Sequence, residues 1–136
     1  MVAANAFGLN QKNKRMELNG ASALLVEDAG LIAMEAQMIL EDVGMEVLGP
    51  ASRISQALDL AETGTIDVAF LDIDLNGEYV WPVAEVLARR GIPFAFATGF
   101  DSKTIVPEPF SGCPMLSKPY REQELVGMAR RLLISP

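Results

Sequence analysis

Five side chains that can take part in metal or phosphoryl chemistry each follow an apolar run of the sequence. They are Glu27, Asp28, Asp72, Thr98 and Lys118. Carboxylates are preferred ligands of hard divalent cations. A hydroxyl and an ammonium can each donate a hydrogen bond to a phosphoryl oxygen. Together the five side chains suit a divalent cation and a phosphoryl group.

The apolar runs have the character of buried parallel strands, which read as continuous apolar stretches. We expect strands at 21–26, 45–49, 66–71, 93–97 and 114–117. Ligands of open parallel sheets bind beyond the carboxyl ends of the strands. The five side chains are therefore predicted to meet at one edge of one sheet.

Helical segments alternate with these strands. We expect helices at about 30–43, from a cap at Ser52 to about 62, from Pro82 to just before Gly91, and from 121 to 134. In the first of them Leu31, Met34, Met38 and Val43 stand near helical spacing. This alternation predicts an α/β fold, a flavodoxin-like (βα)5 three-layer sandwich with a parallel sheet in strand order 2-1-3-4-5.

Three segments do not follow the alternation. Residues 1–20 are polar and locally basic, and we expect a partly disordered extension, either solvated or forming a short helix that docks on a partner. Residues 73–80 are predicted as a loop with a turn at Asn76–Gly77. In 99–113, glycines and prolines leave room for only a short or irregular fourth helix near 101–106.

Composition excludes several classes of function. A net charge of −7 argues against a general nucleic-acid binder and against anionic membranes. No apolar stretch approaches the ~20 residues of a membrane span, and we expect a cytoplasmic protein. Cys113 is the single cysteine and histidine is absent, so histidine-dependent catalysis is excluded and any metal is held by oxygen: magnesium, manganese or calcium.

The residues themselves indicate how the site could work. Asp28 and Asp72 would repel one another, and a magnesium ion held by both and by a backbone carbonyl after Asp72 would relieve that repulsion. The carboxylate of Asp72 can attack phosphorus to form an acyl phosphate. Because the transition state of phosphoryl transfer is loose, the chain needs to do little beyond positioning and neutralising charge. Lys118 and Thr98 can each contact a phosphoryl oxygen.

Four segments in this order resemble the receiver domain of two-component response regulators: LLVEDAG at 24–30, AFLDIDL at 69–75, FATG at 96–99 and LSKPY at 116–120. The resemblance implies a receiver domain over 21–136 that binds Mg²⁺ (or Mn²⁺). It implies metal ligation by Glu27, Asp28, Asp72 and the backbone carbonyl of Asp74, and phosphorylation of Asp72. Thr98 would be the switch hydroxyl, and the Lys118–Pro119 bond is often cis in this family.

The segment PFAFATGF at 93–100 is similar to the FAT GUY group of single-domain regulators of alphaproteobacteria, which is associated with general stress signalling. Two departures from ordinary receivers stand out. Met115 occupies the position of the aromatic ring that usually turns inward on phosphorylation, and Phe100 could replace it. Asp74 adds a carboxylate beside the site, where it could hinder phosphate or orient a hydrolytic water.

The resulting hypothesis is a stand-alone receiver that takes a phosphoryl group from a sensor histidine kinase or phosphotransferase. It would switch contacts with a downstream protein through the helix 4–strand 5–helix 5 face, and it would not be an enzyme beyond its own phosphorylation and slow dephosphorylation. Relaying phosphate, draining it and tuning a kinase stay open as roles. The alternatives are a receiver-like binding module that is never phosphorylated and, on the D-x-D at 72–74, a haloacid-dehalogenase-type phosphatase.

Overall fold

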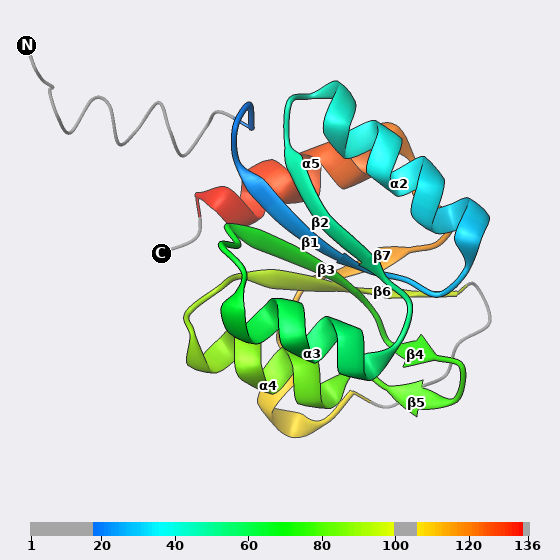
Figure 1. Ribbon diagram of the computed structural model, residues 1–136, viewed down its shortest axis with the longest axis vertical. Helices are drawn as coiled ribbons and strands as arrows, with labels where there is room; N and C mark the ends of the chain where they lie inside the picture. The colour runs from blue at the N-terminus through cyan, green and yellow to red at the C-terminus, as the bar shows by residue number, and fades with distance from the viewer. Residues whose placement is uncertain (1–17, 100–105, 135–136) are drawn as a thin grey trace, which may run out of the picture.

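A parallel sheet forms the centre of the computed structural model, which describes residues 18–99 and 106–134. Its strands are β1 (Ser22–Val26), β2 (Glu46–Ala51), β3 (Val68–Asp72), β6 (Phe94–Thr98) and β7 (Met115–Ser117). They lie in the order β2-β1-β3-β6-β7 (Figure 1). Counted along the chain this is the predicted order 2-1-3-4-5, so the flavodoxin-like topology is confirmed.

Helices cover both faces of the sheet (Figure 1). One face carries α2 (Gly30–Asp42) and α5 (Glu122–Leu133), and the other carries α3 (Ile54–Thr63) and α4 (Trp81–Arg89). Successive strand side chains point to opposite faces, so Leu24 packs toward α3 and α4 while Leu25 packs toward α2 and α5. Because both faces are covered, β1 and β3 are buried along their whole length.

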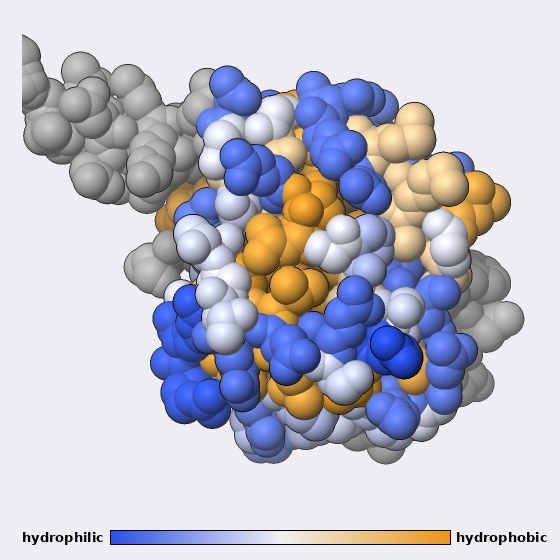
Figure 2. All heavy atoms as spheres, viewed as in Figure 1, coloured by the Kyte–Doolittle hydropathy of each residue, from blue (hydrophilic) through white to orange (hydrophobic). Residues whose placement is uncertain are grey.

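Helix α2 forms where its apolar spacing predicts, but that spacing does not mark the buried face. Ala33, Ala36 and Leu40 face the interior. Leu31, Met34 and Met38 are 70%, 57% and 56% exposed, and we call these three residues the apolar stripe. Alanines let the helix approach the sheet and α5 closely, so the larger side chains lie on the outside of the helix. Figure 2 shows apolar colour over the outer side of α2.

The segment predicted as a loop at 73–80 contains a small antiparallel hairpin of β4 (Asp74–Leu75) and β5 (Glu78–Tyr79). Asn76 and Gly77 form its turn with φ of 52° and 91°, the conformation that Asn-Gly adopts in two-residue hairpin turns. The turn was predicted correctly and the two short strands were not.

Strand β2 lies at the edge of the sheet and contains an irregularity at Gly49–Pro50, whose peptide bond is cis. Gly49 has a φ of +98°, and a Cβ there would lie 2.6 Å from the Ala51 nitrogen and 2.7 Å from the Leu25 oxygen. Only glycine fits such a position. Beyond the irregularity the Ala51 carbonyl accepts the Glu27 N–H at 2.9 Å, so the end of β2 helps to position the first acidic residue.

Helix α3 begins one residue later than a Ser52 cap implies, and that prediction is wrong. Arg53 is the N-cap residue and gives no side-chain cap, while the Ser52 N–H donates to Gln56 Oε1 at 3.2 Å. A glutamine one turn into the helix therefore binds the backbone of Ser52.

The other irregular segments are described in part. The fourth helix expected near 101–106 falls mostly outside the described residues; the segment after it contains one 3₁₀ turn, η1 (Glu108–Phe110). Residues 1–17 also lie outside them, and Leu18, which the sequence places in the extension, is buried in the core on the α2 and α5 face. None of the helices in the described ranges has the length and apolar composition that a membrane crossing requires.

Candidate functional site

Strand register brings the chemistry-bearing side chains to one edge of the sheet. Val26 pairs with Leu71, so Glu27 and Asp72 follow neighbouring strands at the same level. Asp72 pairs with Ala97 and Thr98 pairs with Ser117, which places Thr98 and Lys118 at the same edge. The strand ends therefore meet at one edge of the sheet, as predicted.

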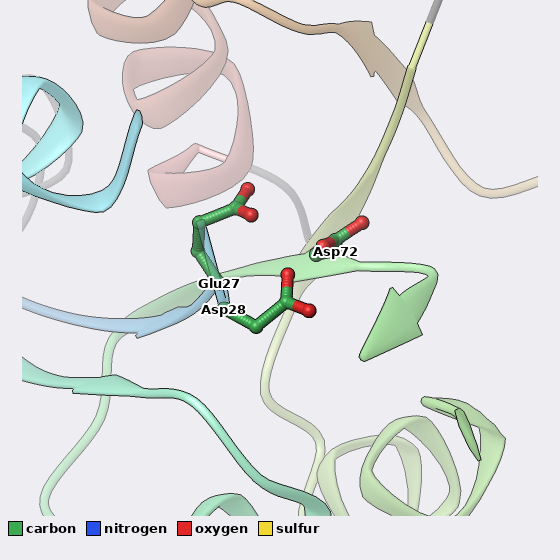
Figure 3. A group of neighbouring side chains, drawn as sticks. All are labelled: Glu27, Asp28 and Asp72. Carbon is green, nitrogen blue, oxygen red and sulfur yellow. The ribbon is translucent and has the colours of Figure 1, made fainter. Parts of the chain in front are cut away.

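Three carboxylates converge at this edge (Figure 3). One oxygen each from Glu27, Asp28 and Asp72 lies within 4.8 Å of the others, and we call these residues the acid cluster. Glu27 is 1% and Asp72 3% exposed, whereas Asp28 is half-buried at the rim. An all-oxygen set of this kind fits a hard divalent cation such as Mg²⁺ or Mn²⁺.

Lys118 supplies the positive charge that faces the acid cluster. Its Nζ lies 3.0 Å from Asp72 Oδ2 and donates a hydrogen bond to Glu27 Oε2 at 3.2 Å. The Ala29 N–H donates to the same Glu27 oxygen at 3.1 Å. The Lys118–Pro119 peptide bond is cis, as predicted. Glu27 and Asp72 are thus held by one ammonium between them.

The electrostatics of the site hold the pKa of Asp72 well above its usual range. Burial, and then the negative charge of Glu27, raise the pKa of Asp72 to about 7, although Lys118 opposes the shift. Burial by itself lowers the pKa of Lys118, but its hydrogen bond to Asp72 and the charges of Asp72 and Glu27 outweigh burial and raise that pKa. The site therefore carries an excess of negative charge that a cation would compensate.

The β4–β5 hairpin lies beside the acid cluster and contacts two of its carboxylates. The Asn76 N–H donates to Asp28 Oδ2 at 3.0 Å, and the Asp74 N–H contacts Asp72 Oδ1 at 3.4 Å. The Asp74 carboxylate accepts the Gly77 N–H at 2.7 Å. It is engaged in the turn, so the structure favours neither of the two roles that the sequence left open for this side chain. Ligation through the Asp74 backbone carbonyl stays a prediction.

The Thr98 side of the site is held less firmly. Thr98 is half-buried, and among the described residues its hydroxyl donates only a long hydrogen bond, 3.4 Å, to the Gly99 carbonyl. Met115, which replaces the usual aromatic residue, is 44% exposed on β7 and pairs with Phe96. Phe100, the possible substitute, lies outside the described residues.

Sequence reasoning missed a group of aromatic rings beside the site. Trp81 stacks on Tyr79 at 5.7 Å between ring centroids, meets the edge of Phe96 at 5.4 Å and stacks on Phe110 at 6.3 Å. These rings join the hairpin, β6 and η1. The signal was available, because Phe94 and Phe96 alternate on one strand and must share a face.

Solved structures and curated proteins similar to the chain agree with this geometry. SdrG from Sphingomonas melonis Fr1 is 38% identical, covers 88% of this chain and 100% of its own, and gives a TM-score of 0.73. A BeF₃-activated conformation of SdrG, from Pseudomonas melonis Fr1, gives 0.67 at the same identity over 84% of this chain and 96% of its own. The chain belongs to the receiver domains of response regulators.

More distant similarities agree with the fold. A CheY-like response regulator receiver domain protein from Methanospirillum hungatei JF-1 is 19% identical, covers 83% of this chain and 94% of its own, and shares the fold with a TM-score of 0.71. The transcriptional regulatory protein PdtaR of Mycobacterium tuberculosis is 26% identical over 76% of this chain and 52% of its own length. The receiver domain spans about half the length of the curated relatives it matches. No family profile matches the chain.

Proposed function

We propose that this receiver domain accepts a phosphoryl group on Asp72 from the phosphohistidine of a sensor histidine kinase or phosphotransferase. One observation carries the proposal: a buried carboxylate at a strand end lies 3.0 Å from a lysine ammonium inside a cluster of three acids. Such an arrangement supplies a nucleophile, a partner for phosphoryl oxygens and a seat for a cation.

The transfer step follows from these groups. A carboxylate oxygen of Asp72 forms a bond to phosphorus while the P–N bond of the donor phosphohistidine breaks, and its electron pair stays on the imidazole, which is protonated. Lys118 and Thr98 contact phosphoryl oxygens. Asp72 must be ionised to attack, so a pKa of about 7 in the free site leaves part of the population inactive near neutral pH.

Glu27, Asp28 and Asp72, with the Asp74 carbonyl, would hold Mg²⁺ (or Mn²⁺). When bound, the dication would neutralise charge on the phosphoryl group and keep Asp72 ionised. Asp28 is suited to the rim position, because the Asn76 N–H engages only its Oδ2. Glu27 is suited to the interior position, since Lys118 and the Ala29 N–H hold its Oε2.

The apolar stripe supports docking of a phosphodonor protein on α2. It begins three residues after Asp28, at the edge where the acid cluster lies, and continues along the helix as Leu31, Met34 and Met38. Contiguous exposed apolar residues mark interaction surfaces more often than chance exposure does. A donor helix on this stripe would hold its phosphohistidine near Asp72.

Output is proposed to pass through the opposite side of the site. Phosphorylation would draw Thr98 toward the phosphoryl group, and Gly99 lets the backbone follow at little steric cost. Residues 106–113 would then shift and change the surface formed with β7 and α5, where Met115 is exposed. SdrG, which is 38% identical to this chain, has a BeF₃-activated conformation, and this supports the proposal of such a response. A role in stress signalling belongs to the same proposal.

Intact-mass measurement after incubation with acetyl phosphate tests the proposal, with Mg²⁺ and with EDTA. We expect one hydroxylamine-labile phosphoryl adduct that needs Mg²⁺ and is lost in Asp72→Asn. No adduct with any donor would favour a binding module instead. Sustained turnover of a small phosphomonoester would favour a phosphatase, although the Asp74 carboxylate, which that chemistry needs as acid and base, is engaged by the Gly77 N–H.

A further inference from the structure

Two buried side-chain oxygens have no hydrogen-bond partner among the described residues, Glu27 Oε1 and the Tyr120 hydroxyl. Glu27 Oε1 lies 3.2 Å from Lys118 Nζ, within ion-pair distance, yet receives no hydrogen bond. Buried polar atoms without partners are rare and need a physical explanation. A phenol can donate and a carboxylate oxygen can only accept, so the two atoms are complementary.

Both atoms belong to the same side of the site. Tyr120 follows Lys118 by two residues, and its ring packs against the core on the α2 and α5 face. That core contains Leu25 and Leu116, which precede Glu27 and Lys118 by two residues each. Because side chains two residues apart on a strand point to the same face, Glu27 and Lys118 lie on the face where the Tyr120 ring packs.

Electrostatics agree with this placement. Burial, and then the negative charges of Glu27 and Asp72, raise the pKa of Tyr120. The phenol therefore keeps its proton at neutral pH and can act as a donor. A water between the phenol and the carboxylate would have three polar partners, because Lys118 Nζ lies beside Glu27 Oε1. Buried waters in proteins typically make about three hydrogen bonds.

We propose that the Tyr120 hydroxyl, through one ordered water, donates to Glu27 Oε1 and fixes the orientation of the Glu27 carboxylate. Tyr120 is then a positioning residue of the acid cluster. Its effect on cation binding rests on the proposed function, whereas its link to Glu27 does not. Partners that orient metal ligands in this way typically change metal affinity by about 10- to 100-fold when removed.

The first measurement is Mg²⁺ binding to the full chain by titration calorimetry. Tyr120→Phe removes only the hydroxyl, and we expect about tenfold weaker binding, the lower end of the range for such partners. The matched control is Tyr79→Phe, since the chain has two tyrosines and Tyr79 is 50% exposed. Equal Mg²⁺ affinity of wild type and Tyr120→Phe would overturn the proposal.

The second measurement needs no cation. In EDTA, a phenol that is paired with Glu27 makes Tyr120→Phe less stable than wild type, and the loss should shrink in a Glu27→Gln background. A more stable Tyr120→Phe would mean that the hydroxyl has no partner, and the proposal would fail. If the coupling appears but wild type binds no Mg²⁺, the link stands and the proposed function fails.

A spectroscopic readout separates positioning from packing. Full chain labelled with 3-fluorotyrosine should give two ¹⁹F resonances, one for Tyr79 and one for Tyr120. We expect Glu27→Gln in EDTA to move the Tyr120 resonance and leave that of Tyr79 in place. An unmoved Tyr120 resonance would contradict the water-bridged link between the Tyr120 hydroxyl and Glu27.

Discussion

The two ends of the site differ in how firmly their side chains are held. At one end Lys118 contacts Glu27 and Asp72 at 3.2 and 3.0 Å, and both carboxylates are buried. At the other end Thr98 is half-buried at the end of β6, and within the described ranges its hydroxyl makes one long hydrogen bond, to the next residue.

This difference separates two tasks. Groups that bind charge gain from being fixed in advance, because a preorganised site does not reorganise during the reaction. A group that reports the change must be able to move, and a hydroxyl that loses little by leaving its present partner can do so. Under the proposed function the charged end would carry out the chemistry and the Thr98 end would transmit the response. Substitutions at the charged end should therefore change stability and cation binding, whereas substitutions at the Thr98 end should change the response.

Lys118→Met should have the largest effect, because it removes the ammonium and keeps most of the apolar stem. Breaking one partner of a buried charge pair costs about 3 kcal/mol or more, and we expect such a loss of unfolding free energy in EDTA at pH 8. At pH 5 the loss should be smaller, since Asp72, with a pKa of about 7, is then protonated. Urea unfolding at the two pH values measures it; equal losses would mean that Asp72 is not the group left unpaired.

Cation binding should depend on pH through the same carboxylate. The pKa of Asp72 is raised from 3.8 to about 7, so Mg²⁺ must displace a proton below pH 7. The apparent Mg²⁺ affinity should then rise about tenfold per pH unit up to pH 7 and level off above it. Stability in EDTA should change with pH in the opposite direction to Mg²⁺ affinity. The raised pKa of Asp72 contributes stability that is fully present below about pH 4 and is lost as the pH rises to 7.

Calorimetric titrations from pH 5.5 to 8.5 test this pH dependence. Lys118→Met serves as a comparison, because without the opposing ammonium the pKa of Asp72 should rise further and the plateau should move to higher pH. A Mg²⁺ affinity that does not change with pH would show that Asp72 is already ionised in the free site.

The meeting of the acid cluster with Lys118 was predictable from sequence for a physical reason. Parallel strands end at a common edge, so residues that follow apolar runs must come together whatever the details of packing. The observed register follows this rule, because it pairs Val26 with Leu71 and Asp72 with Ala97. The order of the strands followed from right-handed crossovers in the same way.

Other features depended on contacts that no local pattern encodes. The hairpin strands are two residues long, too short for a period to be visible, so the link between Asn76 and Asp28 was not foreseen. The stripe on α2 has helical spacing whether it faces the core or solvent. Only the packing of Ala33 and Ala36 against the rest of the fold decided which face was buried.

Met34→Glu tests whether the apolar stripe serves the donor rather than the chemistry. A charge in the centre of the stripe should lower the rate of transfer from a phosphorylated kinase or phosphotransferase about tenfold, a cost of ~1.4 kcal/mol. Labelling by acetyl phosphate should not change, because that donor needs no docking surface. Ser55→Glu on α3 adds the same charge at another exposed position and should leave both rates unchanged.

Equal slowing with both donors would place the effect of Met34→Glu in the acid cluster instead of on α2. Slowing by Ser55→Glu as well would indicate that net charge, already −7, and not the stripe controls the encounter.

Thr98→Ala should have the smallest effect on stability and a decisive effect on response. In the part of the chain that the structure describes, its hydroxyl makes only a 3.4 Å contact, with the Gly99 carbonyl, so we expect the unfolding free energy to stay within about 0.5 kcal/mol of wild type. Mg²⁺ binding should also stay unchanged. Wild-type amide resonances of Gly99 and of residues 106–113 should shift when beryllofluoride and Mg²⁺ are added, and these shifts should be lost in the variant. If the shifts persist without the hydroxyl, another group transmits the change, and the division of the site into a fixed end and a movable end would have to be drawn elsewhere.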